Sequence, residues 1–134
     1  MRRTFLDAGV LIDAARGRAP QSELALRVLD DPDREFIASP FLRLELLPKA
    51  VYHRNRSEVR FYSRYLRSAH FWSGDLVAIV KIASREANRA GLNAMDALHL
   101  AAAYLMKADE FITTEKRQRP IHRNRLVPTV WLYA

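Results

Sequence analysis

Four acidic residues, widely separated in a basic chain, are the side chains best suited to chemistry. They are Asp7, Glu45, Asp96 and Glu115. Each lies where a short apolar run meets a predicted helix or turn, and such junctions form the rim where open α/β sheets bind their ligands. Carboxylates gathered at one rim would repel one another unless a cation bound them. Their types and placement therefore predict a divalent metal site.

A metal site of this kind would suit chemistry on phosphodiester bonds. An ion such as Mg²⁺ prefers hard oxygen ligands and keeps several waters, so a few carboxylates from separate elements suffice to hold it. Such an ion can activate water and neutralise charge that develops on a phosphate, without a nucleophilic side chain. The chain contains no glycine-rich phosphate loop, no Gly-x-Ser-x-Gly motif and no His-Glu-x-x-His zinc motif. The sequence therefore favours metal-assisted chemistry on nucleic acid.

Each acid also has a structural explanation when it is taken alone. Asp7 could form a turn, Glu45 could lie on a helix surface, and Glu115 could begin a solvated charge run. Asp96 would lie in the first turn of a helix, where a carboxylate gains about 0.3–1 kcal/mol from the helix dipole. His99 follows one helical turn later, at a spacing that allows metal ligation. Because its neighbours are apolar, we expect a packed, hydrogen-bonded histidine instead.

Length and composition limit the classes of protein that fit. The chain has 134 residues, of which 49% are hydrophobic, and we expect a single domain over residues 1–134. The 22 Lys and Arg against 15 Asp and Glu give a net charge of +7, which favours polyanionic partners. The absence of cysteine excludes disulfides, thiolate nucleophiles and cysteine-ligated zinc. No segment approaches the ~20 apolar residues of a membrane span, so we expect a cytoplasmic protein.

Basic and aromatic residues gather in two regions. Four arginines recur along one predicted helix: Arg56, Arg60, Arg64 and Arg67. A solvated face, a phosphate track and a site for an acidic protein partner all explain this stripe. A second basic cluster follows Glu115: Lys116, Arg117, Arg119, Arg123 and Arg125. Aromatic residues near the first stripe could stack on bases, although we favour a core or a protein interface: Phe61, Tyr62, Tyr65, Phe71 and Trp72.

Periodicity and capping signals predict alternating strands and helices. The strand candidates are residues 4–6, 35–38, 110–113 and 129–132. The helix candidates are residues 10–12, 22–30 with Ser22 as N-cap, a segment from Ser39-Pro40 through Glu45, 57–67, 76–87 with a helix end at Gly91, and 94–107 with Asn93 as N-cap. An aromatic break is expected at His70-Phe71-Trp72. This alternation predicts an α/β fold with a parallel sheet that helices cover on both faces. We expect residues 116–125 to form a basic loop, because Pro120 and the dense charge oppose regular structure.

Four segments together resemble the PIN-domain family, in particular the VapC ribonuclease toxins of VapBC toxin–antitoxin pairs. They are Phe5-Leu6-Asp7 with Val10-Leu11-Ile12, Arg43-Leu44-Glu45-Leu46, the helical segment from Asp96-Ala97-Leu98-His99 to Ala103, and Phe111-Ile112-Thr113-Thr114-Glu115. The resemblance implies a three-layer α/β/α sandwich with a mainly parallel twisted sheet. It also implies that all four acids are catalytic and bind Mg²⁺ or Mn²⁺.

The resemblance further implies an activity and its partners. The protein would be a metal-dependent endoribonuclease that hydrolyses RNA, the toxin of a type II pair that a small antitoxin neutralises. Thr113 would take a supporting hydroxyl position, and we expect it to bind substrate together with Lys116, Arg117 and Arg119. The exposed aromatic residues are compatible with a homodimer.

Two departures from the family pattern keep an alternative open. Ala8 and Gly9 stand where the family usually places a small hydroxyl residue and then asparagine or serine, and Glu115 stands where aspartate is commoner. The longer side chain of glutamate would leave water-mediated contact with the metal. The alternative is a catalytically weak or inactive PIN-fold module that binds nucleic acid or a protein. A haloacid-dehalogenase-like phosphatase is disfavoured, because its second aspartate would stand at position 9.

Overall fold

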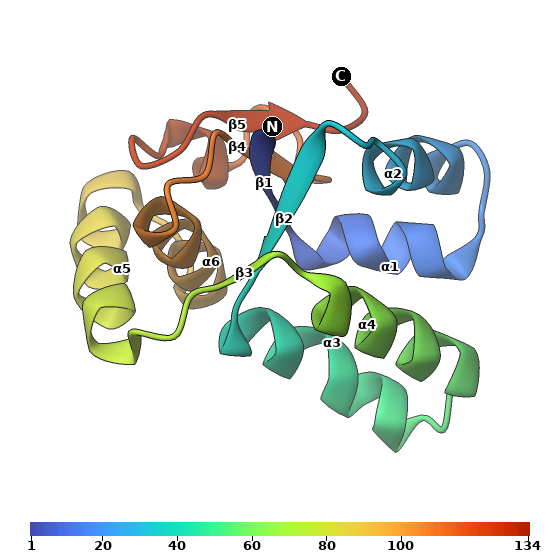
Figure 1. The fold of residues 1–134 in the computed structure, drawn as a ribbon. Coiled ribbons are helices and arrows are strands. Elements are labelled where there is room, and N and C mark those ends of the chain that lie inside the picture. The colour runs from blue at the N-terminus through green and yellow to red at the C-terminus, as the bar shows by residue number, and fades with distance from the viewer.

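The computed structural model describes residues 1–134 and places one sheet between two layers of helices (Figure 1). The strands are β1 (Arg2–Leu6), β2 (Arg34–Ala38), β3 (Phe71–Trp72), β4 (Glu110–Thr113) and β5 (Thr129–Trp131). The helices are α1 (Ala8–Arg16), α2 (Gln21–Leu29), α3 (Pro40–Tyr52), α4 (Arg56–Ser68), α5 (Leu76–Ala90) and α6 (Ala94–Leu105). The expected α/β class is therefore confirmed.

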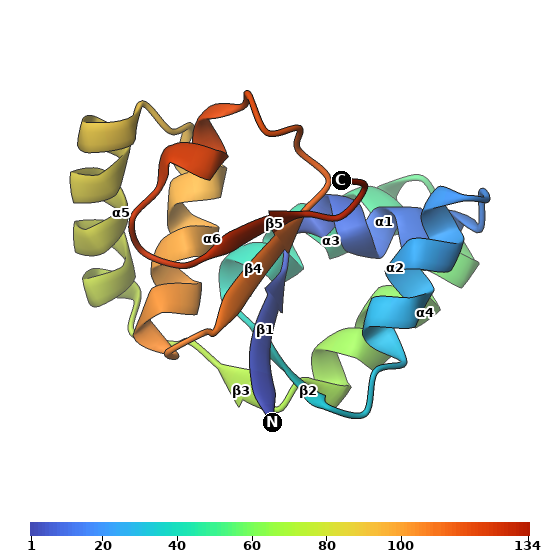
Figure 2. The ribbon, with the colours of Figure 1, turned by 90° about the horizontal axis from the view of Figure 1, so that it is seen from above.

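The five strands form a single sheet in the order β3-β2-β1-β4-β5, and all neighbouring pairs are parallel. Helices α5 and α6 cover one face of this sheet, and α1, α2 and α4 lie on the other (Figures 1 and 2). In a parallel sheet the carboxyl ends of all strands meet at one edge, so the segments after β1, β2 and β4 converge there. The acidic residues were predicted to lie at this edge.

Local capping signals explain most helix boundaries. Asp7 caps α1 by accepting a hydrogen bond from the Ala8 amide at 2.9 Å. Ser39 caps α3 in the same way through the Leu42 amide at 3.2 Å, with proline at the first helical position. Asn93 caps α6, and Gly91 ends α5 in the left-handed conformation.

The structure corrects four expectations about the elements. Helix α2 begins at Gln21, so Ser22 is a buried helical residue and not the N-cap. Helix α6 ends at Leu105, because Lys107 takes a positive φ of 56°. Phe71–Trp72, expected as a break, pairs with β2 as an edge strand. Residues Pro120–Arg123 form a 3₁₀ turn, since proline fits its first position instead of opposing it.

The core is one cluster of 31 buried hydrophobic residues between the sheet and its helices. Phe5 on β1 stacks on Phe111 of β4, with ring centroids 5.3 Å apart, and also lies 5.6 Å from the His99 ring of α6. The core therefore holds His99 in place directly beneath the carboxyl edge of the sheet. None of the helices has the length and apolar character that crossing a membrane requires.

Candidate metal centre

Asp7 lies at the carboxyl end of the central strand β1 and is only 7% exposed. Its backbone amide donates to the Ile112 carbonyl at 2.9 Å, which joins it to the end of β4. The Thr113 hydroxyl donates to Asp7 Oδ2 at 2.9 Å, while Oδ1 caps α1. Burial raises the pKa of the Asp7 carboxyl, although the nearby His99 and the Thr113 hydrogen bond oppose that shift.

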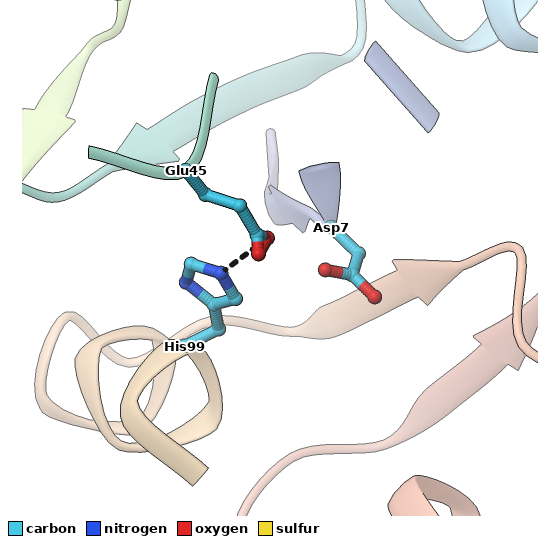
Figure 3. Close-up of side chains that lie close together, drawn as sticks. All are labelled: Asp7, Glu45 and His99. Carbon is cyan, nitrogen blue, oxygen red and sulfur yellow. Dashed lines mark hydrogen bonds and ion pairs between the residues drawn. The ribbon is translucent and has the colours of Figure 1, made fainter. Parts of the chain in front are cut away.

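Glu45 and His99 complete a cluster with Asp7. Glu45 comes from α3 and His99 from α6, and the distance from Glu45 Oε1 to His99 Nε2 is 3.1 Å. One donor atom from each of the three residues lies within 4.8 Å of the other two. The Glu45 carboxylate lies between the imidazole ring and the Asp7 carboxylate (Figure 3). Three elements that are distant in sequence thus bring potential metal ligands together.

The surroundings of His99 decide which role its ring suits. The side chain is fully buried, and its Nδ1 atom has no hydrogen-bond partner. An ionised carboxylate only accepts hydrogen bonds, so the contact with Glu45 requires the proton on Nε2. Coordination of a metal through Nε2 would move that proton to Nδ1, where no acceptor is present. His99 therefore fits better as a donor that orients Glu45 than as a metal ligand.

Asp96 lies beside this cluster on the first turn of α6, one turn before His99. Its Oδ2 accepts a hydrogen bond from Asn93 Nδ2 at 3.1 Å. Partial burial, together with the charges of Asp7 and Glu115, raises the pKa of Asp96 to about 6. Asp96 lies near the cluster but is not among the three residues whose donor atoms lie within 4.8 Å of one another. We call Asp7, Glu45 and the neighbouring Asp96 the acidic pocket.

Glu115 lies at the margin of the acidic pocket. Its amide donates to the Thr113 hydroxyl at 3.1 Å, so the same threonine supports both Asp7 and the start of this segment. Its carboxylate forms an ion pair with Arg119 at 3.2 Å. Glu115 is therefore the one predicted acid that already has a cationic partner from an arginine.

The acidic pocket fits a divalent cation by the chemistry of its donors. No lysine or arginine nitrogen lies within 4 Å of the Asp7, Glu45 or Asp96 carboxylates, although the chain has 22 such residues. Carboxylate oxygens from separate elements are the ligands that Mg²⁺ and Mn²⁺ prefer. Burial is the main cause of the raised pKa of both Asp7 and Asp96, and neighbouring carboxylates add to it.

Comparison with known proteins places this geometry in a family. The PIN-domain family model matches residues 4–123. The chain belongs to the PIN-domain family. No curated protein is similar enough in sequence to match it.

Solved structures with the same fold come from toxin–antitoxin complexes. A chain of VapBC from Salmonella typhimurium, solved bound to DNA, has a TM-score of 0.72 at 14% identity, covering 97% of this chain and 98% of that one. VapBC2 from Rickettsia felis, bound to a promoter DNA fragment, gives 0.71 at 12%, with coverage of 96% and 97%. VapBC-1 from nontypeable Haemophilus influenzae gives 0.70 at 16%, with 98% and 99%. The shared fold extends over nearly the whole chain.

In this PIN domain the space beside Gly9 is filled from another element. A Cβ atom at position 9 would lie 2.3 Å from the Thr114 hydroxyl oxygen, which is far inside contact distance. Thr114 follows β4, so a threonine side chain from that segment occupies the place where a side chain from α1 would project. The missing side chain at position 9 is evident from the sequence, but its replacement by Thr114 is not, because the two residues meet only in the folded chain.

The predicted substrate-binding residues divide into one buried residue and three exposed ones. Thr113 is fully buried, and its hydroxyl is occupied by Asp7 and by the Glu115 amide. Lys116, Arg117 and Arg119 are exposed just beyond Glu115. Of these three, only Arg119 has an acidic partner. His99 was expected as a packed histidine outside the site, and its spacing of one helical turn from Asp96 is the signal in the sequence for its place in the cluster.

Proposed function

We propose that this PIN domain is a metal-dependent endoribonuclease that cleaves RNA phosphodiester bonds at the acidic pocket. The observation that carries the proposal is the cluster of carboxylates without a lysine or arginine partner at the carboxyl edge of the sheet. A chain with a net charge of +7 has ample cations to neutralise these acids, yet none reaches them. Such a pocket is suited to an external cation and a polyanionic substrate.

The contacts of each side chain suggest its role in the proposed reaction. Asp7, Glu45 and Asp96 would hold Mg²⁺ or Mn²⁺, and Glu115 would reach it through water. When bound, the ion would activate water and neutralise charge on the scissile phosphate. Thr113 fixes the Asp7 carboxylate by a hydrogen bond, and His99 fixes that of Glu45.

The exposed cations near the pocket would hold the flanking phosphates. Lys116 and Arg117 have no acidic partner within 4 Å, so their charges are available to a polyanion. Arg119 would exchange its pair with Glu115 for a phosphate as the strand binds. These contacts carry no sequence information, so they would position RNA without selecting it.

The similarity in fold to chains of VapBC complexes supports a biological role as the toxin of a type II toxin–antitoxin pair. A small antitoxin protein would be the partner that inhibits the nuclease. We also propose that the chain acts as a single domain and that it forms a homodimer.

Incubation of pure protein with RNA and either Mg²⁺ or Mn²⁺ tests the proposal. We expect cleavage that a chelator abolishes and that Asp96→Asn abolishes in the same way. Asp30→Asn is the matched control, because Asp30 is an exposed aspartate at the C-cap of α2. Cleavage that survived both the chelator and D96N would contradict the mechanism. An intact fold with no cleavage of any RNA would favour the inactive binding module.

A further inference from the structure

The segment after β4 folds back on itself beside the acidic pocket. The Arg119 amide donates to the Lys116 carbonyl at 2.9 Å, and the His122 amide donates to the Arg119 carbonyl at 3.2 Å. The His122 ring then reaches across the loop, where its Nε2 atom lies 2.7 Å from the Glu115 carbonyl oxygen. Because a carbonyl only accepts hydrogen bonds, this contact requires the proton on Nε2. We call residues 115–122 the closed loop, since the histidine ring joins its two ends.

The far end of the closed loop is fixed to helix α5. The Arg123 guanidinium donates to the Ala90 carbonyl at 2.9 and 3.2 Å, and the Arg89 guanidinium donates to the Arg123 carbonyl at 2.9 Å. The buried Glu86 carboxylate accepts a hydrogen bond from the Arg125 amide at 2.6 Å. The 3₁₀ turn therefore lies against the carboxyl end of α5, as Figure 2 shows. Arg123 thus anchors the loop, although its charge suggested a contact with phosphate.

The near end of the closed loop is joined to the acidic pocket by a short series of hydrogen bonds. Thr113 Oγ1 donates to Asp7 Oδ2 at 2.9 Å and accepts from the Glu115 amide at 3.1 Å. The carbonyl of the same glutamate accepts the bond from the His122 ring. The position of His122 is therefore linked through two residues to the Asp7 carboxylate.

Between these two fixed ends, Lys116 and Arg117 are exposed and carry unpaired charges. Neither has an acidic side chain within 4 Å, and neither makes a side-chain hydrogen bond. Because the backbone on both sides of them is held, their distance from the acidic pocket is restricted before any ligand binds. A site arranged in advance binds more tightly, since less conformational freedom is lost on binding.

We infer that His122 is a positioning residue for RNA binding. By closing the loop it holds Lys116 and Arg117 beside the acidic pocket, where they contact phosphates that flank the scissile bond. The His122 side chain is half-buried and its Nε2 donates to Glu115, so it acts through the two cations and not by touching RNA. The identity of the ligand as RNA rests on the proposed function, whereas the closure of the loop rests on the hydrogen bonds alone.

A histidine with only a structural role would behave differently. Its loss would lower the stability of the fold and leave the RNA affinity of the folded protein unchanged. His70 is the matched control, because its ring also bonds to the backbone, accepting from the Phe36 amide at 3.0 Å. It lies beside β3, which is not adjacent to β4 in the sheet.

Fluorescence anisotropy with a fluorescein-labelled, single-stranded RNA of mixed sequence, in chelator, tests the inference at several salt concentrations. The natural chain is compared with H122L, with H70L, and with H122Q, whose amide N–H can take the place of Nε2–H. K116Q/R117Q removes both cations, and H122L is also made in that background. Circular dichroism verifies that each variant is folded. Should H122L unfold, H122N replaces it, because its shorter amide cannot reach the Glu115 carbonyl.

We expect H122L to weaken RNA binding about tenfold at about 0.1 M salt. The slope of log K against log salt should become shallower by up to about 1.4, because each phosphate contact on a single strand contributes about 0.7. H122Q should recover most of the affinity, and H70L should change it by less than about twofold. In the K116Q/R117Q background, H122L should have little further effect, because the cations that it positions are already absent.

Backbone order parameters, measured by ¹⁵N relaxation without RNA, test the closure of the loop itself. For residues 116–119 we expect values of about 0.85 in the natural chain and in H122Q, and below about 0.6 in H122L. Unchanged order in H122L would contradict the positioning role.

Other results would also overturn the inference. They are RNA affinity that is unchanged in folded H122L, a loss that H122Q does not restore, and additive effects of H122L and K116Q/R117Q. Absence of RNA binding by the natural chain would overturn it as well. Failure of the nuclease proposal alone would look different, because RNA binding would still depend on His122 while Mn²⁺ produced no cleavage.

Discussion

The two edges of the central sheet both carry buried acids, and the chain treats them in opposite ways. At the amino edge, Glu110 begins β4, and its carboxylate accepts hydrogen bonds from Thr4 Oγ1 at 2.6 Å and from Arg34 Nε at 2.8 Å. Arg2 adds a longer contact at 3.5 Å. At the carboxyl edge, Asp7 receives only the Thr113 hydroxyl and the amide of its own helix.

The difference separates an acid with a structural partner from a candidate metal ligand. A buried carboxylate is stable when a guanidinium neutralises it, as Arg34 does for Glu110. A guanidinium contacts the buried carboxylate at the amino edge, but none contacts Asp7 at the carboxyl edge, where burial raises the pKa of the Asp7 carboxyl. Uncompensated carboxylates are costly to keep, so a pocket that retains them is a candidate for an external cation.

Neutralising Asp7 should have the largest effect of the changes considered, because it should abolish stabilisation of the fold by Mn²⁺. We expect Mn²⁺ at a hundredfold excess over its Kd to stabilise the natural chain by about 2.7 kcal/mol. D7N keeps the shape of the side chain, and its amide oxygen can still cap α1, but it removes a charged ligand. Thermal unfolding with and without Mn²⁺ should therefore show almost no stabilisation of D7N. Equal stabilisation of both proteins would place the metal elsewhere.

Removing the cation at the other edge should harm folding and spare metal binding. R34M leaves the Glu110 carboxylate buried with only Thr4 and a distant Arg2, which should lower the free energy of unfolding by about 2–4 kcal/mol. Urea denaturation measures this loss. The Mn²⁺ affinity, measured by calorimetry, should be unchanged. A large drop in affinity would show that the two edges are not independent.

Substitutions at His99 distinguish a donor to Glu45 from a metal ligand. H99L removes the hydrogen bond at 3.1 Å and should weaken Mn²⁺ binding by about tenfold or more. H99Q restores an N–H donor and should recover most of that affinity. The nitrogen chemical shifts of the His99 ring, measured by NMR, should report a proton on Nε2. Direct coordination would instead move that proton to Nδ1 in the presence of a diamagnetic metal.

The acidic pocket should make stability fall as pH rises. Asp96 has a pKa of about 6 in the folded chain against 3.8 as its reference value, so the folded state binds this proton more tightly. Its contribution is fully present below about pH 4 and is lost as pH rises through 6. Urea denaturation in chelator should show this loss, with a smaller slope in D96N. Added Mn²⁺ should reverse it, because the metal binds the deprotonated carboxylates.

The smallest expected effect is on stability, from changes at the contact between Gly9 and Thr114. G9A places a methyl group against the Thr114 hydroxyl and should lower the free energy of unfolding by about 1 kcal/mol. T114A removes the clashing oxygen, so G9A/T114A should be more stable than the sum of the single changes predicts. Additive effects in this double-mutant cycle would mean that Thr114 rotates away without cost.

Much of the fold follows from local signals in the sequence. Ser39-Pro40, Asn93 and Gly91 each mark a helix boundary by a mechanism that acts within a few residues, and all three predictions are confirmed. The two-residue strand β3 could not be predicted, because its only support is pairing with β2. Short elements of this kind depend on a distant neighbour and leave no periodicity of their own.

The candidate site was accessible to sequence reasoning in part. Its acids could be named because each follows a recognisable strand or helix start. Contacts between distant segments could not be named: the bond between His99 and Glu45 joins residues 54 apart, and Thr114 reaches Gly9 from another element. The sequence therefore predicts the types of candidate ligand, whereas the side chains that position them are seen only in the folded chain.

Anomalous diffraction from crystals soaked in Mn²⁺ tests the central contrast between the two edges most directly. We predict a strong anomalous peak at the carboxyl edge, coordinated by oxygens of Asp7 and Glu45, with His99 Nε2 still bonded to Glu45. Glu110 should keep its contact with Arg34 and show no peak. Saturating Mn²⁺ that left Asp7 and Glu45 without a peak, or that bound at Glu110, would contradict the account.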